Sequence, residues 1–344
     1  MSLTLAKRIK AFSRLGSIMN EACSDKPAGN HARRLNRTAV SQYINNPWFT
    51  EDYVIESISA LARSLDEASL NTWLKPYHLE AINSDPKRIG VIMAGNIPLV
   101  GFHDFLCVLI SGNILAGKTS SKDSELIKVI SSILTELEPG FKDSIIQRED
   151  TTEDLYAVIA TGSNNTSRYF EYNYGQLPHI FRKNRNSVAI IHSGISDAEL
   201  KDLGKDVFYY YGLGCRNVSR LYLPFDFDIN RLAETWKEYA SHMKVVPYRN
   251  NYSYNRALYM AEETEYQDLD YLLLKEDHSY SSPISVLYYS FYKSPQELDA
   301  ELALNRDQIQ AIAGKGHTPF GTTQYPALND YADGVDTIEF LLNL

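Results

Sequence analysis

One cysteine stands in a sequence setting that suits a nucleophile. Cys215 follows Gly214 in the segment YYYGLGCRNVSRLYLP, where a helical pattern gives way to an apolar strand pattern. A nucleophilic thiol needs thiolate character, an open approach and a backbone that lets substrate come close. Gly212 and Gly214 provide the close approach, and Arg216 is a cation that favours thiolate. A small buried cysteine at a tight turn would have the same local sequence, because free cysteines are often buried hydrophobes.

An asparagine follows the apolar run of residues 88–95. The pattern predicts a strand that ends at Gly95-Asn96 and a helix that opens at Pro98. Ligands bind at the carboxyl ends of the strands in doubly wound folds, and an amide there can donate a hydrogen bond to a developing oxyanion. Asn96 could equally be a turn residue that caps the helix.

Two further turns could hold a cofactor. Lys118 ends a strand pattern just before the helical segment 124–137, and Gly162-Ser163 lie between a strand pattern and a helix. A lysine and hydroxyls at such places can hold ribose and phosphate groups. Backbone N–H groups at Gly162 and Ser163 could cradle a pyrophosphate, although the GxGxxG spacing is missing. A solvated lysine beside a Ser/Asp cap is the alternative for Lys118.

The elements that must position these residues alternate along the chain. The first 80 or so residues read as helices, with apolar residues such as Val54, Ile58 and Leu65 at helical spacing. From Lys87 onward, strands alternate with helices of 10–15 residues, which predicts βαβ units and a parallel sheet. The expected strands are 88–95, 114–120, 155–162, 187–194 and 218–224, and the expected helices are 97–112, 124–137, 164–175 and 197–214. The Tyr-rich stretch 245–277 has no clear pattern.

The overall composition excludes several classes of function. A chain of 344 residues suggests two domains, or one domain with extensions. The net charge of -9 argues against nucleic acid as the main partner. No run approaches the ~18–20 apolar residues of a membrane span, and the first residues read as an amphipathic helix rather than a signal peptide. Three cysteines without a CxxC pair favour neither disulfides nor a metal site, and fit a cytoplasmic location.

The order of the candidate residues resembles the aldehyde dehydrogenase superfamily. That family carries an oxyanion-hole asparagine, a lysine, a GS turn and a nucleophilic cysteine, here matched by Asn96, Lys118, Ser163 and Cys215. Near the end, GHTPFGTTQYPALNDYADGVDTIEFL resembles the family's PFGG-containing segment. The segments AGNIPLVGFHD, YYGLGCRNVS and DYADGVDT are most similar to the LuxC-like acyl-CoA and fatty acid reductases. The resemblance covers most of the chain from about residue 85 onward.

The resemblance implies an α/β aldehyde-dehydrogenase-like fold, with two doubly wound parallel-sheet domains and an N-terminal helical segment. We expect the N-terminal helices and a dinucleotide-binding domain in residues 1–180, a catalytic domain in 181–315 and a C-terminal segment in 316–344. It assigns Cys215 and Asn96 to catalysis. It assigns cofactor binding to four positions, Lys118, Ser121, Gly162 and Ser163.

Three departures from the family pattern refine the expectation. Hydrolytic relatives carry a water-activating glutamate upstream of the cysteine, but FRKNRNSVAI has no acidic residue. A second family glutamate, which holds the nicotinamide ribose, is matched by Ser279, although Glu276 and Asp277 are near. The acidic residue that repels a 2'-phosphate in NAD-preferring relatives is matched by Ser121, with Lys122 beside it. NADPH is therefore the expected cofactor, with NADH also usable.

The expected function is reduction of a fatty acyl thioester to an aldehyde through a thioester on Cys215. The substrate would be acyl-CoA or an acylated partner protein, and a homo-oligomer is compatible with the sequence. A scaffolding subunit without turnover remains an alternative, and an oxidative aldehyde dehydrogenase is disfavoured by the missing glutamate. His103, His192 and His317 are candidates for the general acid by residue type only. Acyl chain length stays open.

Overall fold

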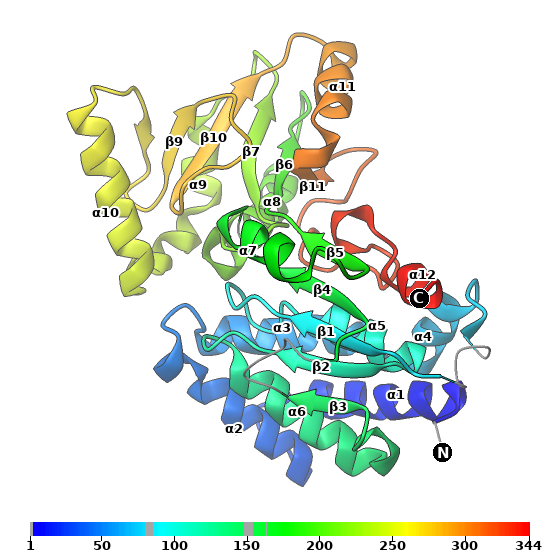
Figure 1. Ribbon diagram of the computed structural model, residues 1–344. Coiled ribbons are helices and arrows are strands. Elements are labelled where there is room, and N and C mark those ends of the chain that lie inside the picture. Colours follow the sequence, from blue (N-terminus) through cyan, green and yellow to red (C-terminus); the bar gives the residue numbers. More distant parts are fainter. Residues whose placement is uncertain (1–2, 80–84, 148–153, 163) are drawn as a thin grey trace. The chain divides into compact units, whose positions relative to one another are not determined.

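The computed structural model describes residues 3–79, 85–147, 154–162 and 164–344 (Figure 1). The chain divides into two compact units, each described by itself below. Unit 1 comprises Met1–Lys183 and Ala327–Leu344, and unit 2 comprises Asn184–Pro326. The stretch 316–344, expected as a separate C-terminal segment, is thus shared: 316–326 fold with unit 2 and 327–344 with unit 1.

Among the described residues, four α-helices precede the first strand of unit 1, in agreement with the helical pattern of the first 80 residues. They are α1 (Leu5–Ala22), α2 (Asn30–Asn45), α3 (Glu51–Ser64) and α4 (Glu67–Leu74). Each buries an apolar stripe; on α1, Phe12, Leu15 and Met19 have no exposed surface. A side-chain cap starts α4, where Asp66 accepts a hydrogen bond from the Ser69 N–H.

The sheet of unit 1 has five parallel strands in the order β3-β2-β1-β4-β5. The strands are β1 (Arg88–Ile92), β2 (Ile114–Lys118), β3 (Ile145–Gln147), β4 (Ala157–Thr161) and β5 (His179–Arg182). The chain moves outward from β1 to β3 and then returns to the other side of β1. Between β1 and β4 the strand order therefore reverses, which is where ligands bind in open α/β sheets.

Helices cover both faces of this sheet. Ile89 and Ile159 face a core shared with α1, α3, α5 (Phe102–Ser111) and α6 (Ser124–Leu137). On the other face, Val158 and Ala160 pack against Phe170 of α7 (Asn164–Tyr174). Figure 1 shows α1, α2 and α6 below the sheet and α7 above it. Unit 1 also contains η2 (Pro139–Phe141), η6 (Ala332–Gly334) and α12 (Thr337–Leu342).

Unit 2 is built on a six-stranded sheet in the order β11-β6-β7-β10-β9-β8, parallel except for β8. Its strands are β6 (Asn186–Ile190), β7 (Val218–Leu223), β8 (Gln267–Asp268), β9 (Leu273–Glu276), β10 (Val286–Phe291) and β11 (Ile309–Ala313). Its helices are α8 (Asp197–Phe208), η3 (Tyr209–Gly212), α9 (Asn230–Thr235), η4 (Lys237–Lys244), α10 (Val246–Ala261), α11 (Pro295–Leu304) and η5 (Arg306–Gln308).

Both faces of the second sheet are also buried. On β7, Leu221 and Leu223 join a core with Leu203 of α8, whereas Tyr222 joins a core with Leu298 of α11. Burial on both faces explains why the run VSRLYLP is nearly continuous in apolar residues. Of the described helices, none is both long enough and apolar enough to span a membrane.

Candidate active site

The carboxyl edge of the first sheet gathers most of the residues expected to bind a cofactor. Lys118 is the last residue of β2 and pairs with Ile92, the last residue of β1. The Met93 N–H still donates to the Lys118 carbonyl at 2.9 Å, so the chain leaving β1 stays beside β2. Gly162 directly follows β4, and Ser163 lies outside the described residues. Asn96, Lys118 and Gly162 are therefore brought to one edge, at the point where the strand order reverses.

The turn after β1 and the loop after β2 are in direct contact. A Cβ atom on Gly95 would lie 2.6 Å from Ser120 Oγ, so a side chain at position 95 would push the two segments apart. Asn96 follows with an exposed side chain, and Ser121 and Lys122 are exposed on the neighbouring loop. The edge thus presents amide, hydroxyl and ammonium groups to solvent.

The helix expected to open at Pro98 instead begins at Phe102, with Gly101 as its N-cap. Leu99 adopts a left-handed conformation (φ 58°), which interrupts a helix at that point. The sequence prediction of the helix start was wrong for this reason. It also follows that Asn96 is not the cap of α5, so the capping alternative is removed. Its catalytic role stays a prediction.

A buried aspartate, which the sequence analysis considered only as part of a Ser/Asp cap, joins the two loops. Asp123 is the N-cap residue of α6, and its Oδ2 accepts a hydrogen bond from the Leu99 N–H at 2.7 Å. Its own N–H donates to the Ser120 carbonyl at 3.0 Å. The side chain is 3% exposed, and burial raises its pKa to about 7. An Asp directly before a helical pattern was the available signal.

Cys215 lies in unit 2, in the turn between η3 and β7, as the sequence predicted. It is half-buried. The two other cysteines are poor nucleophiles, because burial raises the pKa of the Cys23 thiol to about 11 and that of Cys107 well above its usual range. Just before the turn, Tyr210 and Tyr211 both adopt left-handed backbone conformations, with φ of 50° and 59°. Such strain is concentrated at functional sites in proteins.

The Asn217 side chain holds the cysteine turn. Its Oδ1 accepts from the Gly214 N–H at 2.8 Å, and its backbone N–H donates back to the Gly214 carbonyl at 3.0 Å. Its Nδ2 donates to the carbonyls of Tyr209 at 2.8 Å and Asp206 at 3.1 Å, near the end of α8. Asn217 is 3% exposed. A single buried amide therefore links the end of the helix to both sides of Cys215.

A second buried group holds the same turn from β6. The Ser187 hydroxyl donates to the Cys215 carbonyl at 3.0 Å and accepts from the Ala311 N–H at 3.1 Å. Ser187 is fully buried. The hydroxyl lies at a shift in register between β6 and β7, so one strand irregularity is used to fix the cysteine backbone.

The PFGTT segment, which was matched to the family's PFGG motif, is anchored to the helix before the cysteine turn. Asp206 of α8 accepts hydrogen bonds from the Gly321 N–H at 2.7 Å, the Thr323 N–H at 3.0 Å and the Thr323 hydroxyl at 2.8 Å. The carboxyl is fully buried, and burial raises its pKa to about 6. Gly321 has a φ of 79°, which favours glycine.

The loop between β9 and β10 contains Ser279, the position matched to the family's ribose-binding glutamate. The Ser279 N–H donates to Asp277 Oδ1 at 2.8 Å, and Lys275 pairs with Asp277 at 2.9 Å. The Tyr280 carbonyl accepts a hydrogen bond from the Ser219 hydroxyl of β7 at 2.6 Å. Glu276 is exposed at the end of β9.

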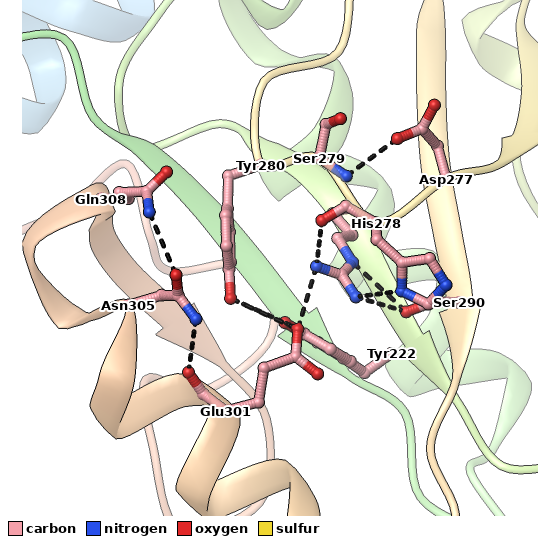
Figure 2. A network of polar contacts seen from close by, with 10 residues as sticks. Tyr222, Asp277, His278, Ser279, Tyr280, Ser290, Glu301, Asn305 and Gln308 are labelled. Carbon is pink, nitrogen blue, oxygen red and sulfur yellow. Dashed lines mark hydrogen bonds and ion pairs between the residues drawn. The ribbon is translucent and has the colours of Figure 1, made fainter.

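Arg220 on β7, a residue that the sequence analysis did not single out, anchors this loop (Figure 2). It is fully buried and donates to the His278 carbonyl at 2.6 Å and to Ser290 Oγ at 2.7 Å. It also pairs with Glu301 of α11 at 3.1 Å. A charged residue in the middle of an apolar strand was the sequence signal, because a buried charge requires partners.

The segment DYADGVDT is held in unit 1 by another buried arginine. Arg182, at the end of β5, pairs with Asp104 of α5 at 2.6 Å. It also donates to the Ala332 carbonyl at 2.8 Å and to the Thr337 hydroxyl at 2.9 Å. This segment therefore has a structural role in the unit that carries the cofactor-binding candidates.

Two of the candidate histidines have local partners. His103 Nε2 lies 2.9 Å from the Leu328 carbonyl, and His192 Nε2 lies 3.5 Å from Glu199. His317 is exposed in the turn after β11. None of these contacts identifies a general acid.

Each unit has a cavity near the amino ends of its strands. A small cavity of ≈ 50 Å³ lies beneath the cysteine turn and is lined by Gly214, Asn217 and residues 282–286. The cysteine turn and the end of the β9–β10 loop therefore face a common space. A larger cavity of ≈ 790 Å³ is lined by Lys87 and Asn113, next to the amino ends of β1 and β2. It lies at the opposite edge from the cofactor-binding candidates. No cluster suited to a metal ion occurs among the described His, Cys, Asp and Glu residues.

Comparison with known proteins rests on the fold, because no family model and no curated protein matches the sequence. An aldehyde dehydrogenase from Bacillus cereus, solved with NAD⁺, superposes with a TM-score of 0.61 at 12% identity, covering 90% of this chain and 70% of that one. Aldehyde dehydrogenase 21 from Physcomitrella patens gives 0.56 at 15% identity, covering 85% and 70%. The indole-3-acetaldehyde dehydrogenase AldA of P. syringae gives 0.60 at 12% identity, covering 86% and 69%.

This chain has the aldehyde dehydrogenase fold. The prediction of that fold from Asn96, Lys118 and Cys215 is confirmed. The aldehyde dehydrogenase fold accounts for the two parallel sheets and for the helices that precede the first strand. The edge of unit 1 also fits a dinucleotide, since Gly95 lets two loops lie close and Lys118 and Lys122 supply positive charge beside exposed hydroxyls.

Proposed function

We propose that this protein is a nicotinamide-dependent oxidoreductase that reduces an acyl thioester to an aldehyde, as in the LuxC-like acyl-CoA reductases. The observation that carries the proposal is the turn around Cys215, whose backbone is fixed by hydrogen bonds. A half-buried thiol follows two left-handed tyrosines, and the side chains of Asn217 and Ser187 fix its backbone. A cysteine with only a packing role would not need this framework.

In the proposed reaction, the Cys215 thiolate attacks the acyl carbonyl of acyl-CoA and expels the CoA thiolate. Asn96, an exposed amide in the turn after β1, is the proposed oxyanion donor, together with the Cys215 N–H. Each such donor is worth roughly 3–4 kcal/mol in better-studied enzymes. The cofactor, when bound, supplies hydride to the enzyme thioester. Protonation gives a thiohemiacetal on Cys215, which loses its hydroxyl proton again as it collapses to free aldehyde and the regenerated thiolate.

The proposed hydride donor is NADPH, held by Lys118, Ser121, Gly162 and Ser163. The 2'-phosphate of NADPH carries negative charge, and the loop after β2 presents Ser121 and Lys122 without a carboxylate between them. Asp123, the next acidic residue, is buried against Leu99 and therefore does not face a bound phosphate. NADH lacks this phosphate and would bind more weakly through the same residues.

The decisive experiment is acyl labelling in the absence of reduced cofactor. Incubation with radiolabelled acyl-CoA should leave one acyl group per chain, on the tryptic peptide of residues 206–216, which contains Cys215 as its only cysteine. Cys215→Ala should abolish the label, while Cys23→Ala and Cys107→Ala should keep it. Subsequent addition of NADPH should release aldehyde. Label that survives Cys215→Ala would overturn the proposal.

The acyl donor is tested with the same protein. A series of acyl-CoAs of increasing chain length, followed by NADPH absorbance and CoA release together, should show one CoA released for each NADPH oxidised. Release of CoA without oxidation of NADPH would instead favour an acyl-transfer role.

A further inference from the structure

Two serine hydroxyls join the loop between β9 and β10 to the cysteine turn. The Ser187 hydroxyl donates to the Cys215 carbonyl at 3.0 Å. The Ser219 hydroxyl lies 3.3 Å from the Ser187 carbonyl and 2.6 Å from the Tyr280 carbonyl. The two serines lie on neighbouring strands, β6 and β7. The loop is therefore held at a fixed place relative to the nucleophile.

The buried Arg220 side chain holds the same loop at one residue. Its Nη1 donates to the His278 carbonyl at 2.6 Å, and its Nη2 lies 3.4 Å from His278 Nδ1 (Figure 2). The same guanidinium donates to Ser290 Oγ at 2.7 Å and pairs with Glu301 at 3.1 Å. Because Arg220 is fully buried among these partners, its position is fixed, and it fixes His278 in turn.

These contacts determine which ring nitrogen of His278 carries the proton. A guanidinium can only donate, so His278 Nδ1 is the acceptor in its contact with Arg220. In the neutral imidazole the proton then lies on Nε2. The His278 side chain is exposed. The loop therefore presents one oriented N–H donor to a ligand, close to the cysteine turn.

We propose that His278 Nε2–H donates a hydrogen bond to an oxygen of the nicotinamide riboside half of the cofactor. This inference rests on the proposed function, in which hydride passes to a thioester on Cys215. The nicotinamide then has to lie beside the cysteine turn, and its ribose hydroxyls and carboxamide carbonyl are acceptors for such a donor. Arg220 does not touch the cofactor in this proposal. It is a positioning residue that acts through His278.

The two acidic residues that precede His278 are less suited to this role. The carboxylate of Asp277 is already occupied, since it pairs with Lys275 at 2.9 Å and accepts from the Ser279 N–H at 2.8 Å. Glu276 is exposed at the end of β9, and no residue in the described part of the chain pairs with its carboxylate. Nothing orients Glu276 toward a ligand in the way that Arg220 orients His278.

Two ligands that differ by the nicotinamide riboside test the proposal. NADPH contains it, whereas adenosine 2',5'-bisphosphate does not, and quenching of tryptophan fluorescence gives both affinities without turnover. His278→Ala should weaken NADPH binding at least about threefold, as expected for one hydrogen bond, and leave binding of the bisphosphate unchanged. His278→Gln keeps an N–H donor and should restore most of the NADPH affinity. Glu276→Gln, in the same loop, is the matched control and should bind both ligands normally.

The role of Arg220 is tested by coupling between two substitutions. Arg220→Lys keeps the charge but loses the forked donors, so NADPH affinity should fall about as far as in His278→Ala. Adding His278→Ala to Arg220→Lys should then cost little more, because both changes remove the same contact. Acyl labelling of Cys215 without cofactor should proceed in His278→Ala at the wild-type rate, which separates a cofactor contact from damage to the turn. Circular dichroism melts check that every variant is folded.

The possible failures are distinguishable. Unchanged NADPH affinity in His278→Ala, equal losses for both ligands, or a loss confined to Glu276→Gln would each overturn the role of His278. A wild type that binds neither ligand would overturn it as well. A wild type that binds NADPH but takes no acyl label on Cys215 would instead contradict the proposed function, and the affinities would still decide whether His278 contacts the nicotinamide riboside.

Discussion

The backbone N–H of Leu99 donates a hydrogen bond to the carboxylate of Asp123 at 2.7 Å. Leu99 belongs to the turn after β1 that carries Asn96, and Asp123 ends the loop that follows Lys118 and carries Ser121. One hydrogen bond therefore couples the proposed oxyanion donor to the proposed cofactor loop. Asp123 Oδ1 has no hydrogen-bond partner among the described residues, so ionisation of this carboxyl is poorly compensated.

We predict that Asp123 makes the protein less stable as pH rises from about 4 to 7. Burial raises its pKa from 3.8 to about 7, so the folded protein holds the proton more tightly than the unfolded chain does. The stabilisation from Asp123 is complete at pH values below its pKa in the unfolded chain and is lost as pH rises through its pKa in the folded protein. The free energy of unfolding falls by at most about 4 kcal/mol over this range. Asp123→Asn removes this dependence, so its stability relative to the wild type should increase between about pH 4.5 and pH 8.

Urea unfolding of both proteins across this pH range measures the effect. Asp143→Asn, at an exposed acidic position after α6, is the matched control and should leave the pH dependence unchanged. Wild type and Asp123→Asn curves that run parallel would contradict the prediction.

We also predict that Asn217→Ala disables the cysteine turn. The change removes acceptors and donors for Gly214, Tyr209 and Asp206 and leaves buried backbone groups unpaired, at a cost of about 1–3 kcal/mol each where water cannot replace the partner. Acyl labelling of Cys215 should slow at least about tenfold under conditions where the variant is folded. Asn251→Ala on α10, whose side chain donates to the Pro247 carbonyl, is the matched control. Normal labelling of a folded Asn217→Ala would show that the turn does not depend on this amide.

The parts of the fold that the sequence predicted are those with simple hydrophobic patterns. The strands β1, β2, β4, β6 and β7 are buried runs bounded by turn residues, and such runs can be recognised without a structure. The stretch 245–277 could not be assigned, because α10 buries Tyr248, Tyr252 and Tyr259 where most helices bury aliphatic residues. Because these tyrosines stand among polar residues, the sequence shows no clear apolar pattern with a helical period.

The candidate site shows a similar division. The shared location of Lys118 and Gly162 was predictable, because the carboxyl ends of parallel strands lie at one edge of the sheet. The hydrogen bonds from Ser187 to Cys215 and from Gly321 to Asp206 join positions far apart in sequence. No local sequence pattern predicts such long-range contacts. The backbone conformation of Leu99 could not be predicted for a different reason. Its left-handed backbone is unusual for leucine, and propensity alone continued the helix through it.

We predict that Lys118→Glu weakens binding of NADPH far more than binding of NADH. The lysine lies at the end of β2, three residues before Ser121, so the new carboxylate would repel the 2'-phosphate that NADPH alone carries. A difference of at least about tenfold between the two losses is expected, since like charges at close range cost several kcal/mol. Quenching of tryptophan fluorescence gives both affinities. Lys128→Glu, on the exposed side of α6, is the control, and equal losses for both cofactors would show that Lys118 does not contact the phosphate.

Finally, we predict that the reaction stops at the aldehyde and that formation of acid is slow. The stretch from Phe181 to Ile191, which the sequence resemblance matches to the water-activating glutamate of hydrolytic aldehyde dehydrogenases, contains Arg182, Lys183 and Arg185 but no carboxylate. A positioned general base contributes typically 10²–10⁴-fold, so hydrolysis of the acyl-enzyme should be slower than in those enzymes by about that range.

Run in reverse with aldehyde and NADP⁺, turnover should depend on free CoA or another thiol, because only a thiol can then remove the acyl group from Cys215 at a useful rate. Titrating CoA into this reaction while measuring NADPH formation and acid release by separate assays distinguishes the two routes. Thiol-dependent turnover with little acid supports an acyl-thioester reductase. Stoichiometric acid at full rate without any thiol would mean that a residue outside Phe181–Ile191 activates water, and the protein would then act as an oxidative aldehyde dehydrogenase on the same fold.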